Sequence, residues 1–208
     1  SAGSSASSSR SHDSASSGRM RLLPRDLPGQ RCVESTVVVE PRPDDHSQHV
    51  DLFGNRVDYF SIHEAHRELV ITAESIVAVA APAGLPLDGD LPWEQAVERI
   101  GRGGPDDVDA VHFSLDSPVV TRTDAFRAYA APSFPPGRPI VEAVLDLSSR
   151  IHREFEFVPG ETEVDTPLAD VLAKRKGVCQ DFAHIGIACL RSMGLPARYV
   201  SGYLETDP

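Results

Sequence analysis

The sequence predicts an α+β fold in which an N-terminal antiparallel β-sandwich precedes a mainly helical part. Residues 31–81 contain short β-branched runs separated by turn residues at intervals of about ten positions, which is typical of a sandwich. Residues 82–92 are rich in proline, glycine and aspartate, as in a linker. Beyond them, apolar residues recur at helical spacing, so the second half is expected to be built mainly from helices.

The β-branched runs of the first half predict three or four strands. They cover residues 32–40, 57–62 and 68–73, and 74–80 either continues the third strand or forms a fourth. Prolines at 41 and 43 end the first run, and the polar stretch 44–47 has the composition of a turn. We therefore expect consecutive strands to pair through short connections.

The second half predicts five helices, followed by one strand. The helices cover residues 92–100, 123–130, 139–155, 166–172 and 179–193. The longest has Ile140, Val144, Leu147 and Ile151 on one face. In the fourth, Thr166 is expected to be the N-cap. Gly194 and Pro196 end the last helix, and 197–204 resembles a strand.

Composition and charge exclude several classes of protein. The chain has 208 residues, of which 40% are hydrophobic and 25% charged, enough apolar material for a core. Its formal charge of −11 argues against nonspecific nucleic-acid binding, which needs basic patches. No apolar run is long enough to span a membrane. Three cysteines at unrelated spacings indicate free thiols in a reducing compartment, so we expect a cytoplasmic protein.

Both ends of the sequence suggest special segments. Residues 1–18 are mostly serine, alanine and glycine, which bury little apolar surface, so we expect a disordered tail or an addition from cloning. The other end follows directly after the predicted strand 197–204, and we expect a core that lacks its later part.

Cys179 is the candidate nucleophile. It follows Gly177 and opens the amphipathic run 179–193, so it is expected on the first turn of a helix. Free N–H groups at a helix start favour a thiolate, which is the attacking form of a cysteine. A buried structural cysteine is the alternative, and it is the expected role of Cys189 and of Cys32.

A cysteine nucleophile needs a base, usually a histidine. His184 follows Cys179 by five residues and lies about 140° away around the helix, so it is expected to pack rather than to act as the base. His152, late in the predicted helix 139–155, is a second candidate for the base, but we do not expect it to face the site. Gln180 and Asp181 are expected to be capping and solvated residues, although a catalytic role stays open.

Other candidate motifs favour no cofactor and no metal. The histidine pairs 46/49 and 63/66 have a spacing that places partners on opposite faces of a strand, and neither pair matches a zinc signature. The glycine-rich stretch 101–104 lacks the Lys-Ser/Thr of a phosphate loop. We therefore expect no metal site and no bound cofactor.

One stretch carries a family resemblance. Residues 177–184, Gly-Val-Cys-Gln-Asp-Phe-Ala-His, and their continuation to Leu204 closely resemble bacterial transglutaminase-like proteins. Residues 132–139 and 166–172 are similar to the same family's approach to its cysteine, and 51–55 with the strands around them resemble its N-terminal β domain.

The resemblance implies a papain-like core in which a Cys–His–Asp triad transfers acyl groups through a thioester. Cys179 matches the nucleophile. The family's histidine and aspartate have no matching motif here, and Asp207 comes too early to be the triad acid. The implied domains are a tail (1–18), an N-terminal β domain (19–82), a linker with a short helix (83–110) and a truncated core (111–208).

The expected activity is therefore acyl transfer on peptide or protein amides, such as a glutamine side chain, with neither nucleic acid nor membrane as a partner. Hydrolysis and crosslinking both remain open. A noncatalytic binding or scaffold module is the alternative, and the 208-residue chain alone is expected to be inactive because it lacks the triad histidine and aspartate.

Overall fold

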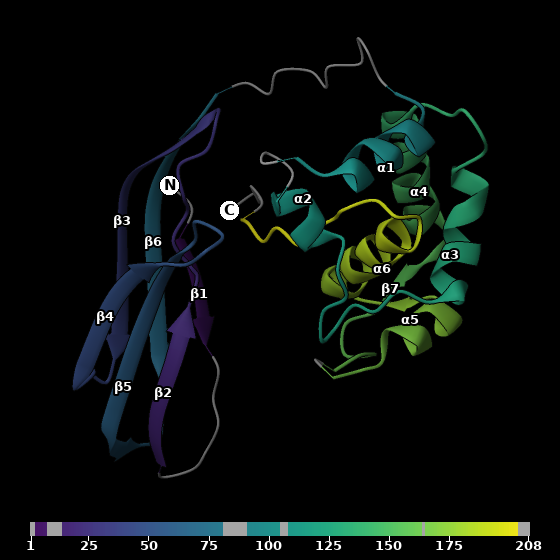
Figure 1. Cartoon of the computed structure of the whole chain (residues 1–208). Helices are drawn as coiled ribbons and strands as arrows, with labels where there is room; N and C mark the ends of the chain where they lie inside the picture. Colours follow the sequence, from purple (N-terminus) through teal and green to yellow (C-terminus); the bar gives the residue numbers. More distant parts are fainter. Residues whose placement is uncertain (1–2, 8–13, 81–90, 105–107, 164, 204–208) are drawn as a thin grey trace. The chain divides into compact units, whose positions relative to one another are not determined.

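The computed structural model describes residues 3–7, 14–80, 91–104, 108–163 and 165–203. The chain divides into two compact units, one formed by residues 1–84 and 202–208 and the other by residues 85–201 (Figure 1). Strands make up the first unit and helices dominate the second, so the predicted α+β class is confirmed.

The first unit consists of two three-stranded antiparallel sheets. One has the order β1 (Gly3–Ser7), β6 (Val70–Val79), β3 (Gln30–Glu40), and the other β2 (Ser14–Met20), β5 (Arg56–His66), β4 (Asp45–Val50). Both sheets contribute to one buried cluster, formed by Met20, Val39, Phe60 and Ile62. This shared core makes the unit a sandwich, as the alternation of the strands predicts.

Two segments of this unit differ from the prediction. The expectation of a disordered tail over residues 1–18 is wrong for β1 and β2, because β2 pairs with β5 and β1 with β6. Backbone pairing does not depend on apolar side chains. Gly18 helps β2 to approach its sheet closely, since a Cβ there would lie 2.7 Å from the Phe60 ring.

The predicted turn at 44–47 is also wrong, because residues 45–50 form β4. Every residue of β4 is exposed, since the strand lies at the edge of its sheet. A polar edge strand has no apolar alternation and is easily mistaken for a turn.

The second unit contains six α-helices and a two-stranded parallel ladder among its described residues. The helices are α1 (Trp93–Arg102), α2 (Val108–Phe113), α3 (Asp124–Ala130), α4 (Ile140–Glu154), α5 (Leu168–Lys174) and α6 (Cys179–Ser192), and the strands are β7 (Glu156–Phe157) and β8 (Lys176–Gly177). A 3₁₀ turn at Ala131–Ser133 follows α3 directly. The five predicted helices are confirmed, and α2 was not predicted.

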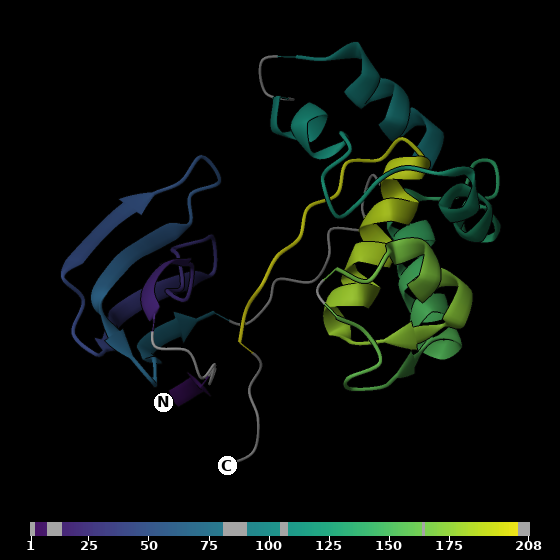
Figure 2. The ribbon, with the colours of Figure 1, turned by 90° about the horizontal axis from the view of Figure 1, so that it is seen from below.

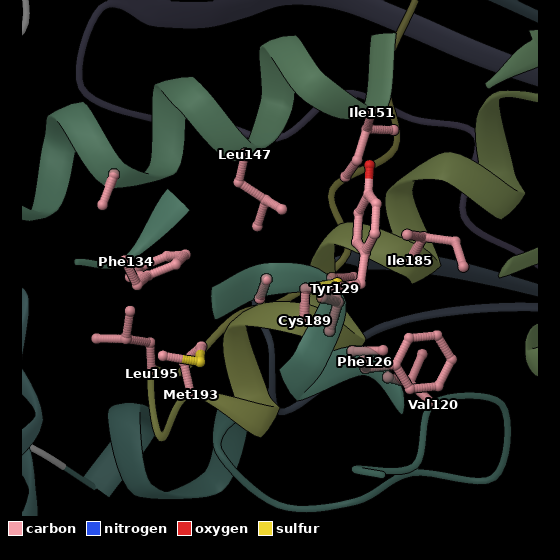
Figure 3. Close-up of a cluster of buried hydrophobic side chains, with 14 of the residues drawn as sticks. Val120, Phe126, Tyr129, Phe134, Leu147, Ile151, Ile185, Cys189, Met193 and Leu195 are labelled. Atoms are coloured by element: carbon pink, nitrogen blue, oxygen red, sulfur yellow. The ribbon is translucent and has the colours of Figure 1, made fainter. Parts of the chain in front are cut away.

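The core of this unit lies where α6 packs against α3, α4 and α5 (Figures 1 and 2). Leu147 and Ile151 of α4 point toward the side chains of α3 and α6 in Figure 3, as the helical spacing predicts. Ile185 and Cys189 of α6 are fully buried. The tight packing around α6 fixes the axis of the helix that begins at Cys179.

Two boundaries in this unit correct the sequence prediction. Pro167 rather than Thr166 is the N-cap of α5, and the Thr166 hydroxyl instead accepts a hydrogen bond from the Glu163 N–H. The strand expected at 197–204 is not formed over its described residues 197–203. The Ala197 N–H bonds to the Phe113 carbonyl and its own carbonyl accepts from Arg191, so its backbone groups are satisfied outside any ladder.

Candidate active site

Cys179 is the first residue of α6, as predicted, and it is exposed to solvent. Val178 is the N-cap, with an extended backbone (φ −117°, ψ 175°). The first N–H groups of a helix have no partner within the helix, and they form a partially positive end. The Cys179 thiol therefore lies where the helix can stabilise a negative charge.

Asp181, the third residue of α6, holds the start of this helix through its side chain. Its Oδ2 accepts hydrogen bonds from the Val178 N–H at 2.8 Å and from the Thr162 hydroxyl at 2.7 Å. The residue is 7% exposed, so the expectation of a solvated Asp181 is wrong, whereas the expected capping role is confirmed. A carboxylate that accepts from the backbone at an N-cap makes a strong, charge-assisted bond.

Gly177 allows the chain to pass close to this carboxylate. A Cβ at Gly177 would lie 2.6 Å from Asp181 Oδ2. This distance is too short for two non-bonded atoms, so any side chain here would force a shift. Gly177 also belongs to β8, whose parallel ladder with β7 includes a hydrogen bond from the Val158 N–H to the Gly177 carbonyl at 2.9 Å. The ladder and the buried carboxylate together determine where α6 begins.

His184 lies more than one turn further along α6 and packs against Tyr199, with 5.4 Å between the ring centroids and an angle of 50° between the ring planes. The Cys179 thiol has no hydrogen bond with any residue in the described part of the chain. The structure shows His184 packed against a ring but does not test whether it acts as the base, so the expectation that it does not stays a prediction. His152 is exposed near the end of α4, and Gln180 is exposed on the first turn of α6.

Burial lowers the pKa of His184 below its ordinary value of 6.5, and the nearby Asp181 carboxylate partly opposes this effect. The unfolded chain then binds a proton more readily than the folded chain, so the His184 contribution to stability is full above pH 6.5 and declines as the pH falls. An NMR titration of the His184 ring should give a midpoint below 6.5. A midpoint at or above 6.5 would contradict this prediction.

The other cysteines have the structural surroundings expected of them. Cys189 is fully buried, and burial raises the pKa of its thiol to about 12 against the opposing charges of Arg150 and Arg175. Cys32 lies in β3, is partly buried, and its thiol contacts the Glu34 carbonyl oxygen at 3.5 Å. Cys179 is thus the exposed thiol of the three.

Two histidines of the first unit lie beside carboxylates. His46 Nε2 lies 3.2 Å from the buried Asp58 carboxylate, and His63 lies between the carboxylates of Asp44 and Asp45 at 3.8 and 3.7 Å. The described residues include no group of three or more histidine, cysteine, aspartate or glutamate side chains arranged to hold a metal. They also include no helix with the length and apolar character needed to cross a bilayer.

A hollow of about 910 Å³ lies at the far end of α6, with Met193 and Gly194 in its wall. A 14-residue helix is about 20 Å long, so this hollow is well separated from Cys179. No cysteine lines the hollow, and we therefore place the candidate chemistry at Cys179.

The sequence does not reveal two residues beside the cysteine loop, by which we mean residues 176–182. Thr162 lies in a connecting segment without a recognisable motif, and only the fold brings its hydroxyl to Asp181. Arg175 has a left-handed backbone (φ 58°), and nothing in the sequence distinguishes it from its charged neighbours. Glycine is the usual residue at a left-handed position after a helix, so an arginine there does not mark the end of α5 in the sequence.

Two family models match the chain. Residues 13–78 match the bacterial transglutaminase-like N-terminal region, and residues 127–208 match the transglutaminase-like superfamily. Among solved structures, a protein from Cytophaga hutchinsonii described as a candidate cysteine protease has a TM-score of 0.68 at 20% identity, over 89% of this chain and 61% of that chain. The likeness to that structure shows a shared fold.

Three mycobacterial relatives are similar over nearly the whole chain. Uncharacterized proteins of Mycobacterium tuberculosis and Mycobacterium bovis are each 48% identical over 194 residues, and one of Mycobacterium leprae is 31% identical over 191 residues. Each alignment covers 92% of this chain but only 60%, 60% and 65% of the relatives, respectively. Strands β2 to β5 lie inside the matched N-terminal region and Cys179 lies inside the matched core, so over residues 13–78 and 127–208 the chain is transglutaminase-like.

Proposed function

We propose that the protein is a cysteine acyltransferase or amide hydrolase that acts on peptide or protein amides, with Cys179 as its nucleophile. The observation that carries this proposal is the exposed thiol at the first position of α6. The helix start around it is fixed by partly buried hydrogen bonds, and a nucleophile needs such preorganisation.

In the proposed reaction, Cys179 Sγ attacks the carbonyl carbon of a carboxamide, for example that of a glutamine side chain. The C–N bond then breaks, the amine leaves with the thiol proton, and a thioester remains. Water or a second amine attacks the thioester, and its proton returns to sulfur as the C–S bond breaks. The Cys179 backbone N–H is the proposed donor to the oxyanion.

A complete site also needs a base and a group that orients it. The family resemblance implies a histidine and an aspartate, and neither has a matching motif in this chain. Because the chain spans about 60% of the length of the mycobacterial relatives, we propose that the longer protein supplies them. The three free thiols favour a reducing, cytoplasmic setting.

The test is mass spectrometry of a glutamine-containing peptide incubated with a primary amine. Both the 208-residue chain and a version extended along its reading frame to the length of the relatives should be assayed. We expect ligation of the amine, or else deamidation or cleavage of the peptide, with the extended protein only. Cys179→Ala should abolish all three products, whereas Cys189→Ala should retain them.

Ligation would identify a transferase, and deamidation or cleavage a hydrolase. If the extended protein leaves the peptide unchanged, or if Cys179→Ala remains active, the proposed function is wrong. Peptide binding without turnover would instead favour a noncatalytic binding module, the alternative that is consistent with the lack of a described partner for Cys179.

A further inference from the structure

Arg175 has an unusual backbone conformation for its residue type. It ends α5 with φ 58° and ψ 32°, and it is the one residue other than glycine with a positive φ in the part of the chain that the structure describes. This left-handed conformation costs free energy for any residue with a Cβ, and glycine is preferred at such helix ends. The cost of this conformation directs attention to the contacts that the Arg175 side chain makes.

The Arg175 side chain is held by a cluster of aromatic rings. Its guanidinium carbon lies 4.2 Å from the ring centroid of Tyr129 in α3 and 4.8 Å from that of Phe155, which follows α4. One of its nitrogens lies 3.8 Å from Glu154. Arg150 stacks on the same Tyr129 ring at 4.7 Å and also pairs with Glu154, at 3.3 Å.

This cluster connects to the cysteine loop by two routes. Along the backbone, the Arg175 carbonyl accepts a hydrogen bond from the Glu156 N–H at 2.8 Å, which is the first bond of the β7–β8 ladder. Through side chains, Phe155 packs edge-on against Phe182, with 5.7 Å between their centroids. The Phe182 N–H makes the first backbone bond of α6, to Val178.

We propose that Arg175 is a positioning residue for Cys179. Its stacked guanidinium fixes residue 175 against α3 and α4, so that β8 and Gly177 enter α6 in one geometry and Cys179 is its first residue. The left-handed backbone of Arg175 directs the following residues into β8. The contacts of its guanidinium with Tyr129 and Phe155 keep that backbone from changing to another conformation. That this positioning serves catalysis rests on the proposed function, whereas the positioning itself does not.

Three variants test this proposal in the otherwise intact chain. Arg175→Gly removes the side chain but suits the left-handed backbone, so the thermal midpoint should change little. Arg175→Lys keeps a cation that can lie over an aromatic ring but lacks the planar stacking of a guanidinium. Arg198→Gly is the matched control, because Arg198 also lies over a ring, that of Phe113 at 5.5 Å, and belongs to a segment outside the cysteine loop.

Two measurements report on the loop itself. Hydrogen exchange of the amides of residues 176–182 should become about tenfold faster in Arg175→Gly. Iodoacetamide labelling of Cys179, resolved by peptide mass spectrometry, should slow by about threefold, because the exposed thiol then loses its fixed position beside the N–H groups of the helix start. Arg175→Lys should recover part of both effects, and Arg198→Gly should match the wild type.

The proposal is overturned if Arg175→Gly leaves exchange and labelling at wild-type values. It is also overturned if exchange rises equally across all helices together with a lower thermal midpoint, since that pattern indicates a general loss of stability. A lysine variant no better than glycine would likewise contradict a role for the stacked cation. Loop exchange is measured without a substrate, so absence of acyl transfer in the extended protein would count against the proposed function and not against the positioning of the loop.

Discussion

Replacing Gly177 with alanine is expected to destabilise the second unit by about 3 kcal/mol. The new Cβ would lie 2.6 Å from Asp181 Oδ2, 3.0 Å from its Cβ and 3.1 Å from its Cγ, so the whole side chain is in the way. Relief requires movement of the carboxylate, which would break its bonds to Val178 and Thr162. Urea denaturation followed by far-UV circular dichroism measures the loss, and Cys179 labelling should change together with it.

Two further variants separate this clash from a general effect of glycine replacement. Gly101→Ala is the matched control, because a Cβ there meets nothing within 4 Å and alanine favours the helix, so its stability should be unchanged or higher. Asp181→Ala should itself cost about 2 kcal/mol, since the Val178 N–H loses its partner. The Gly177→Ala/Asp181→Ala double variant should lose clearly less than the sum of the single losses. Full additivity would show that the two residues do not act on one another.

Leu147→Ala is expected to cost about 3 kcal/mol, within the range for large-to-small changes in a core. The Leu147 side chain is 2% exposed and lies in the cluster between α4 and the helices α3 and α6 (Figure 3). Removing it leaves a cavity beside α6, which close packing on all sides prevents from collapsing fully. The same urea measurement, with an unchanged slope, reports the loss.

Leu145→Ala supplies the control within the same helix. Leu145 is 51% exposed, so the same chemical change at a position two residues away should alter stability by less than about 0.5 kcal/mol. Equal losses for the two variants would mean that α4 does not pack through the face that contains Leu147.

The helices of the second unit were predictable because their apolar residues follow the period of a helix closely. The face of α4 with Leu147 and Ile151, and the position of Cys179 at the start of α6, follow from spacing, a preceding glycine and a following Gly194. Strands were harder wherever pairing rather than side-chain pattern determines them. The serine-rich β2 and the polar β4 form ladders through their backbones, and no alternation of apolar residues marks them.

The site was predictable only in part, because its geometry depends on contacts between distant positions. The sequence predicts that Cys179 begins a helix and suggests a capping role for Asp181, and the structure confirms both. It does not show that Thr162 will meet Asp181, or that Arg175 will stack on Tyr129 and Phe155, since these contacts join residues 19 to 46 positions apart. The strand expected at 197–204 is not formed over its described residues 197–203, and the reason is related, because a strand depends on pairing with a neighbour that local sequence does not reveal.

The β7–β8 ladder has a consequence for the order in which the protein folds. Its two strands are joined by one short helix, α5, and its pairs link residues 20 positions apart. Closing so short a loop costs little chain entropy, and contacts of this range form quickly. We therefore expect the surroundings of Cys179 to assemble early in folding, before the longer-range packing of α3 against α6 is complete. Cys179, the proposed nucleophile, would then have its final local geometry before the rest of its domain has formed.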